Sequence, residues 1–100
     1  MIVYNVTSAI DESIEKEWVA WMKDHHMPDV IGTKMFTQFR LYKILATQEP
    51  RTVSYSAQYM ARSMEDVNTY LEKFAPALRA EVSTKYGEKA VSFRTLLEEV

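Results

Sequence analysis

The sequence predicts an α+β protein with a ferredoxin-like fold: a four-stranded antiparallel sheet with two helices on one face. The expected elements follow the order β-α-β-β-α-β, and two right-handed crossovers place both helices on the same side of such a sheet. The expected strands alternate apolar and polar side chains, as strands do when one face is covered and the other is open. With 100 residues, 47% of them hydrophobic, the chain is long enough for a core of its own. We therefore expect one domain over residues 1–100.

The first strand is expected over residues 2–9, where apolar and polar side chains alternate. Asp11 then offers a side-chain oxygen as a helix N-cap. Pro28 disfavours helical angles at the residue before it, so the first helix is expected to falter near Met27. Five residues of this helix share one side at helical spacing and are expected to be buried: Ile14, Trp18, Trp21, Met22 and His25.

The second and third strands are expected over residues 35–45 and 52–60, joined by a hairpin loop at residues 47–51. Ser63 is placed to cap the second helix, with Asp66 completing a capping box. Pro76 is expected to kink or break the second helix, and Gly87 is expected to end it. The last strand is expected over residues 90–97.

Alternation within the strands assigns side chains to the two faces of the sheet. The side facing the helices is expected to receive Ile2, Tyr4, Val6, Phe39, Leu41, Val53, Tyr55, Ala57, Tyr59, Val91 and Phe93. The open side is expected to receive Asn5, Thr7, Gln38, Arg40, Tyr42, Ser54, Ser56, Gln58, Ser92 and Arg94.

Composition argues against several classes of function. The net charge of −2 gives no electrostatic reason to bind nucleic acid, and the open face lacks the stacked aromatic side chains of RNA-binding sheets. The absence of cysteine excludes a thiol nucleophile, a disulfide framework and a zinc finger. No apolar run is long enough to cross a membrane, and the first residues read as a strand rather than a signal peptide. We expect a soluble cytoplasmic protein that binds neither nucleic acid nor membrane.

Three segments, "MIVYNVT", "EWVAWMKDHHMPDV" and "VSFRTLLEEV", resemble a family of short bacterial proteins of unknown function. The resemblance covers essentially the whole chain and includes a His-x-Pro motif, here His26-Met27-Pro28. It implies a ferredoxin-like domain related in shape to the dimeric α+β barrel proteins, and hence a homodimer. That wider group includes cofactor-independent monooxygenases, small isomerases and haem-degrading enzymes. The haem-degrading branch places its essential histidine on the second helix, whereas both histidines of this sequence lie on the first.

The two histidines are the first candidates for a site. His25 and His26 are neighbours, so in a helix they point about 100° apart and cannot chelate one metal ion as a pair. A metal site would need carboxylates from elsewhere, such as Asp24 or Asp29, and we expect neither a metal nor a cofactor. His26 reads either as a cation at a helix end or as a general acid or base. His25 reads as a partly buried histidine satisfied by a backbone carbonyl.

Two regions could hold a ligand. Between helix and sheet, the hydroxyls of Tyr4, Tyr55 and Tyr59 would need polar partners, and a small polar pocket there could be bordered by His26 or His25. Trp18 and Trp21 read as core side chains more than as a platform for a ligand. On the open face, Arg40 and Arg94 allow three interpretations: a solvated surface, a dimer interface or an anion site.

Two functional hypotheses remain from the sequence. The first is a homodimeric module that binds a small organic or anionic molecule, or that is purely structural. In it His25, Trp21, Arg40 and Arg94 are the candidate ligand-binding residues. The alternative is a cofactor-independent enzyme, like a monooxygenase or an isomerase, with His26 as acid or base beside Tyr4 or Tyr55.

Overall fold

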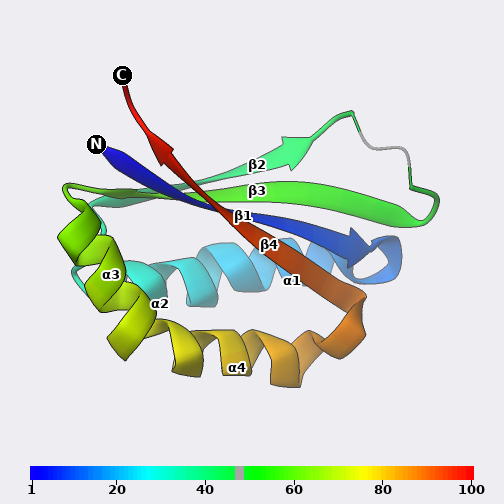
Figure 1. Ribbon diagram of the computed structural model, residues 1–100. Helices are drawn as coiled ribbons and strands as arrows, with labels where there is room; N and C mark the ends of the chain where they lie inside the picture. The colour runs from blue at the N-terminus through cyan, green and yellow to red at the C-terminus, as the bar shows by residue number, and fades with distance from the viewer. Residues whose placement is uncertain (47–48) are drawn as a thin grey trace.

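The structure, a computed structural model, describes residues 1–46 and 49–100, so Thr47 and Gln48 of the expected hairpin loop lie outside the described residues. One four-stranded sheet carries the described helices on one side and leaves its other face open (Figure 1). This confirms the predicted ferredoxin-like α+β fold. The elements are β1 (Ile2–Asp11), the 3₁₀ turn η1 (Glu12–Ile14), α1 (Glu15–Trp21), the π-helical segment η2 (Met22–His26), α2 (Met27–Gly32), β2 (Gln38–Ile44), β3 (Thr52–Ala61), α3 (Met64–Lys73), α4 (Ala75–Tyr86), the 3₁₀ turn η3 (Gly87–Lys89) and β4 (Ala90–Glu98).

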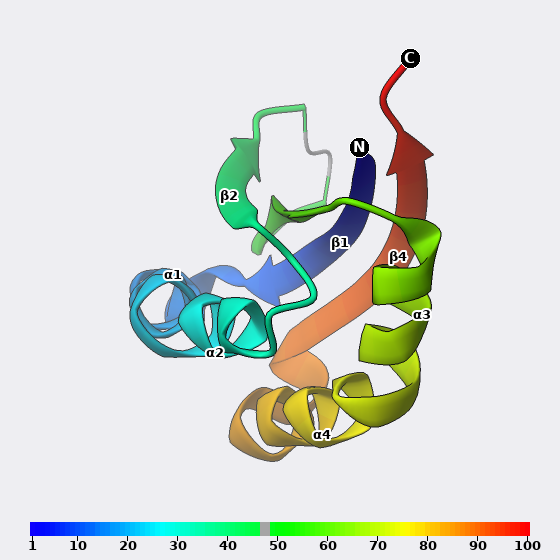
Figure 2. The ribbon, with the colours of Figure 1, turned by 90° about the vertical axis from the view of Figure 1, so that its left-hand side faces the viewer.

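The sheet has the strand order β2-β3-β1-β4, and every neighbouring pair is antiparallel. Figure 2 shows two groups of helices against the same face of the sheet, α1 with α2 on the side of β2, and α4 with α3 on the side of β4. The core lies between sheet and helices, and its largest fully buried side chains are Trp18, Tyr59, Ile10, Met27, Val30 and Val67. None of the described helices is both long and apolar enough to cross a membrane.

The first helical region loses its regular α-helical form just before Met27, close to the predicted point, but Met27 itself does not leave helical angles as expected. Met27 has φ −65° and ψ −40°, which are helical angles, and the helix continues to Gly32. The irregularity appears one turn earlier, where Met27 N–H donates to the carbonyl of Met22, five residues back. Pro28 has no N–H to donate, and its ring needs space beside the preceding turn. The wider π turn provides that space, so the helix continues beyond Pro28 instead of ending there.

The π turn changes which histidine is buried. A π segment adds a residue to one turn, so the buried stripe of α1 shifts by one position beyond it. Trp18 and Met22 are buried as predicted, but the stripe resumes at His26. His26 is 9% exposed, whereas the His25 side chain is 51% exposed. Both the expected partial burial of His25 and the expected helix-end position of His26 are therefore wrong.

The second helical region follows the predictions closely. Ser63 caps α3 by accepting a hydrogen bond from the backbone N–H of Asp66 at 3.2 Å. The helix breaks at Phe74, two residues before Pro76, which lies in the first turn of α4. Gly87 ends α4 with φ +55°, a backbone conformation that glycine adopts without steric cost.

The last strand faces the other way from the prediction. In the register of β1 and β4, Val6 pairs with Arg94 and Ser8 pairs with Ser92, so these side chains share the helix-facing side. A hydrogen bond of 2.7 Å between the hydroxyls of Ser8 and Ser92 accompanies this register. Val91 and Phe93 therefore lie on the open face, where they are 62% and 64% exposed. Hydrophobicity alone misassigned this strand because its apolar side is the uncovered one.

Candidate functional site

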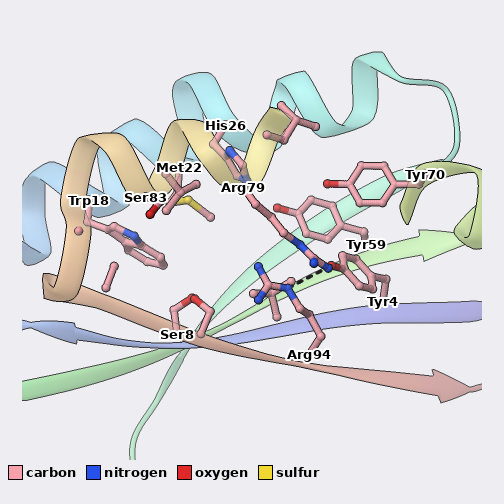
Figure 3. A pocket seen from close by; sticks show the side chains of 16 residues that line it. Tyr4, Ser8, Trp18, Met22, His26, Tyr59, Tyr70, Arg79, Ser83 and Arg94 are labelled. Carbon is pink, nitrogen blue, oxygen red and sulfur yellow. Dashed lines mark hydrogen bonds between the residues drawn. The ribbon is translucent and has the colours of Figure 1, made fainter. Parts of the chain in front are cut away.

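A cavity of about 250 Å³ lies between the sheet and the helices (Figure 3). Strands β1, β3 and β4 contribute its sheet side, and residues of α1, η2, α3, α4 and η3 contribute its helical side. Figure 3 shows Trp18 and Met22 side by side at one end of the cavity, with Ser8 and Ser83 near them. The other apolar lining residues are Val6, Leu78, Val82 and Ala90. The other polar lining residues are Tyr4, His26, Tyr59, Tyr70, Arg79, Ser92 and Arg94.

Tyr4 is the polar centre of the cavity. Its ring is 3% exposed, and its hydroxyl accepts two hydrogen bonds, from Arg79 Nη2 at 3.1 Å and from Arg94 Nε at 3.3 Å. Figure 3 shows Arg79 reaching the hydroxyl from α4 and Arg94 reaching it from β4. Two guanidinium groups that repel each other thus meet at one neutral oxygen.

Neither Arg79 nor Arg94 forms an ion pair with a carboxylate of residues 1–46 or 49–100. Both side chains are exposed enough at the mouth of the cavity to keep part of their hydration. Each guanidinium has five N–H donors in a planar fork, and the Tyr4 hydroxyl accepts only one from each. The remaining donors match the oxygens of a carboxylate or a phosphate.

Two further tyrosines bring hydroxyl groups to the cavity. Tyr59 and Tyr70 both line it, and no described residue forms a hydrogen bond with either hydroxyl. Burial raises the pKa of both phenols, so each is a neutral donor at physiological pH. Phe36 stacks against the ring of Tyr4 and packs edge-on against Tyr70, which holds this end of the cavity rigid.

His26 projects into the cavity from η2 (Figure 3). Its Nδ1 atom is buried without a hydrogen-bond partner among the described residues. Burial lowers the pKa of His26 and outweighs the opposing effect of the Glu81 and Asp29 carboxylates, so the ring is neutral near pH 7. A buried ring nitrogen without a partner costs stability, and a ligand atom could satisfy it.

The predicted pair of His26 and Tyr4 therefore shares one cavity, but the third candidate, Tyr55, does not line it. The Tyr55 hydroxyl donates to Glu15 Oε2 at 2.6 Å, and the same oxygen pairs with Lys43 Nζ at 2.9 Å. Trp18 packs against Tyr55 with ring centroids 5.2 Å apart and separates it from the cavity. Tyr55 is a structural residue in this arrangement.

The candidate ligand-binding residues also lie in different places. Arg94 lines the cavity, whereas Arg40 lies on the open face of the sheet opposite Gln58. The expected position of Arg94 on the open face beside Arg40 is therefore wrong, and the two arginines cannot form one anion site there. Trp21 stands beside the cavity and stacks on both histidines, with centroids 5.4 Å from His25 and 5.3 Å from His26.

Arg79 and Tyr70 are lining residues that the sequence did not single out. Arg79 follows Leu78 on α4, and in sequence it reads as an ordinary exposed helix arginine. The available signal was its position one turn before Ser83 and beside a stripe of Ala75, Leu78 and Val82. This position identifies Arg79 as a site residue only when the structure shows Arg94 of β4 at the same hydroxyl.

Solved structures with the same fold match the whole chain. An ethyl tert-butyl ether D (EthD) family protein from Bacillus halodurans matches at a TM-score of 0.69 and 12% identity, covering 100% of both chains. A dimeric ferredoxin-like protein from an uncultured marine organism matches at a TM-score of 0.59 and 10% identity, covering 100% of this chain and 97% of that one. A de novo designed protein with a ferredoxin fold matches at a TM-score of 0.53 and 20% identity, covering 100% and 88%. At these identities the likeness establishes the fold.

A family model, described as a domain of unknown function (DUF4286), matches residues 1–100. None of the curated proteins matches the chain.

Proposed function

We propose that this chain, which belongs to the DUF4286 family of domains of unknown function, binds a small amphipathic organic anion in the cavity beside Tyr4. The observation that carries the proposal is the meeting of Arg79 and Arg94 on one hydroxyl with no carboxylate of the described residues beside them. Two neighbouring positive charges raise the free energy of the unliganded protein, and an anion would offset that repulsion.

The lining of the cavity favours a ligand with one charged end and one apolar end. The guanidinium groups would hold a carboxylate or phosphate, and the hydroxyls of Tyr59 and Tyr70 can donate to its oxygens. The opposite end, at Trp18, takes an aliphatic or aromatic group. A cavity of about 250 Å³ is below the usual range for drug-sized ligands, so the ligand is small.

We also infer that the chain forms a homodimer through the open face of the sheet. Apolar side chains lie along both edge strands of this face: Val91, Phe93 and Leu97 on β4, and Tyr42 on β2, which are between 45% and 64% exposed. Several large apolar side chains exposed on one face are typical of protein interfaces. Two solved structures of the same fold are described as dimeric ferredoxin-like proteins, which supports a dimer but does not say which face forms it.

The centre of the open face suits a two-fold axis. Asn5 lies there and is only 8% exposed, and its side chain donates to Thr7 Oγ1 and accepts from the Ser56 hydroxyl. These groups satisfy one another, so a second sheet can cover them at little cost in desolvation. A second copy would then bury the apolar edges around a polar centre.

Ligand binding can be tested with three anions, benzoate, hexanoate and phenyl phosphate, and with benzyl alcohol as the neutral comparison. We expect at least one anion to raise the melting temperature, because a ligand that binds only the folded state stabilises it. Arg79→Gln and Arg94→Gln are each expected to weaken that anion by at least about tenfold, since hydrogen bonds to charged groups contribute about 1.5–3 kcal/mol. Calorimetric titration measures the affinity.

Arg40→Gln is the matched control, because Arg40 carries the same charge on the opposite face of the sheet. It should leave the affinity unchanged. Equal weakening by all three arginine variants would indicate only long-range attraction to net charge. Failure of every anion to bind the wild-type protein at millimolar concentration would contradict the proposal.

A further inference from the structure

Outside the cavity, three side chains from two neighbouring helical regions meet at the surface. His25 of η2, Asp29 of α2 and Glu81 of α4 each offer one ligand atom, and the three atoms lie within 4.8 Å of one another. His25 Nε2 is 3.4 Å from Asp29 Oδ2 and 3.0 Å from Glu81 Oε1. We propose that this cluster binds a divalent transition-metal ion, with Zn²⁺ as the best fit.

The distances from His25 to the two carboxylates suit that ion. Zinc holds imidazole nitrogen and carboxylate oxygen at about 2.0–2.2 Å, so the ligands of a tetrahedral site stand about 3.3–3.6 Å apart. The two distances from His25 lie close to this range. One imidazole with two carboxylates gives three protein ligands and leaves the fourth position to water. A nitrogen ligand favours zinc, cobalt or nickel over magnesium and calcium, which prefer oxygen.

The charges of the cluster also call for a cation. Asp29 and Glu81 bring two negative charges to one point, and no described lysine or arginine pairs with either of them. Lys85 lies over the Trp21 ring but pairs with Glu17 instead. Because a histidine that ligates a metal ion does so as neutral imidazole, the three ligands would together carry a charge of −2, which a divalent ion neutralises.

The local fold positions the three ligands. His25 and Asp29 stand four residues apart on one continuous helix, so their side chains project from the same side. The His25 ring stacks on Trp21 at an interplanar angle of 27°, which fixes its orientation. The side chains of His25, Asp29 and Glu81 are 51%, 48% and 44% exposed, so an ion can reach them from solvent.

An ion at this point would join α4 to the helical segments η2 and α2, which lie beside it on the same face of the sheet. Glu81 lies on α4 between Arg79 and Ser83, which line the cavity. His25 precedes His26, another lining residue, in η2. Metal binding should therefore stabilise the packing of α4 against η2 and α2. This site does not depend on the proposed anion binding, because none of its three ligands lines the cavity.

The test is a zinc titration of the full chain prepared without a histidine tag, using a chromophoric chelator in competition, and a parallel titration with Co²⁺ followed by its visible absorption. We expect binding of one Zn²⁺ per chain and a rise in melting temperature that EDTA reverses. His25→Gln and Glu81→Gln should each weaken Zn²⁺ by at least about tenfold. Asp24→Asn is the matched control, since Asp24 is an exposed carboxylate beside His25 that is not in the cluster; it should change affinity less than about twofold.

Melting of each variant without metal separates loss of binding from loss of folding. Wild-type protein that binds no Zn²⁺ below about 1 mM would overturn the proposal and leave the cluster as an ion triad that links the helices. The proposal would also be overturned if His25→Gln and Glu81→Gln bound Zn²⁺ as tightly as Asp24→Asn.

Discussion

Glu15 illustrates how much one side chain can connect. Its carboxylate accepts a hydrogen bond from the Tyr55 hydroxyl of β3 and pairs with Lys43 of β2, so it ties the start of α1 to two strands. These contacts lower the pKa of Glu15, with the Tyr55 hydrogen bond as the largest cause. Burial and the same carboxylate raise the pKa of Tyr55 to about 12, which keeps the donor protonated.

Glu15 should therefore contribute stability that depends on pH. Its pKa is lower in the folded protein than the value of about 4.3 expected in the unfolded chain. The contribution is present above that unfolded value and is lost as pH falls through the folded pKa. We expect Glu15→Gln to be less stable than wild type at pH 7, with the difference shrinking on acidification, as measured by urea unfolding across the acid range.

Glu72→Gln is the comparison for this experiment, because Glu72 is an exposed carboxylate on α3. Its effect should stay small at every pH. A loss for Glu15→Gln that is the same in acid as at pH 7 would show that the ionised form of Glu15 contributes nothing.

At the scale of elements, sequence patterns predicted most of the fold and missed two local details. Caps and breakers such as Ser63, Pro76 and Gly87 act on their own neighbours, so they could be read from the sequence. The π turn could not, because the buried face of α1 was assigned with a fixed period of 3.6 residues. The facing of β4 could not either, because its more apolar side, with Val91 and Phe93, is the uncovered one.

That limit explains why only part of the candidate site was predicted. Tyr4 and His26 were placed in one helix–sheet pocket from the sequence, and the structure brings them together. Arg94 was assigned to the wrong face, and its partner Arg79 was missed. The meeting of these two arginines depends on how β4 pairs with β1 and where α4 crosses it, which is tertiary information.

The stripe of α1 and η2 gives a prediction for stability. Trp18 is 1% exposed and packs on Tyr55, so Trp18→Ala should lower the free energy of unfolding by about 3–5 kcal/mol. His26→Ala should cost clearly less, because His26 borders the cavity and its Nδ1 atom has no partner to lose. Urea melts of the two variants make the comparison. Equally large losses would mean that His26 is held in the core by packing alone.

At the scale of the whole molecule, the two proposed sites lie on opposite faces of the sheet. The helix-facing side contains the cavity and its arginines, while the open side carries an apolar rim around a satisfied polar centre. Association through the open side would leave the helices and the cavity free. The proposed dimer and the proposed ligand site are thus compatible, and they can be tested separately.

Strand β4 offers a matched pair of substitutions for the dimer. Phe93 pairs with Thr7 on the open face and is 64% exposed, whereas Leu96 pairs with Tyr4 on the helix-facing side and is 47% exposed. Both are large apolar residues of the same edge strand. Phe93→Ser removes apolar area only from the proposed interface, so it should weaken the dimer, whereas Leu96→Ser should leave it intact.

Sedimentation of the wild type and both variants at tens of micromolar measures the outcome, and circular dichroism checks that each remains folded. We expect the wild type to sediment as a dimer and Phe93→Ser to shift towards monomer. The open face would not be the interface if Phe93→Ser dimerised as well as Leu96→Ser. A monomeric wild type would instead leave Phe93 and its apolar neighbours exposed to solvent, which is an arrangement that invites aggregation at higher concentration.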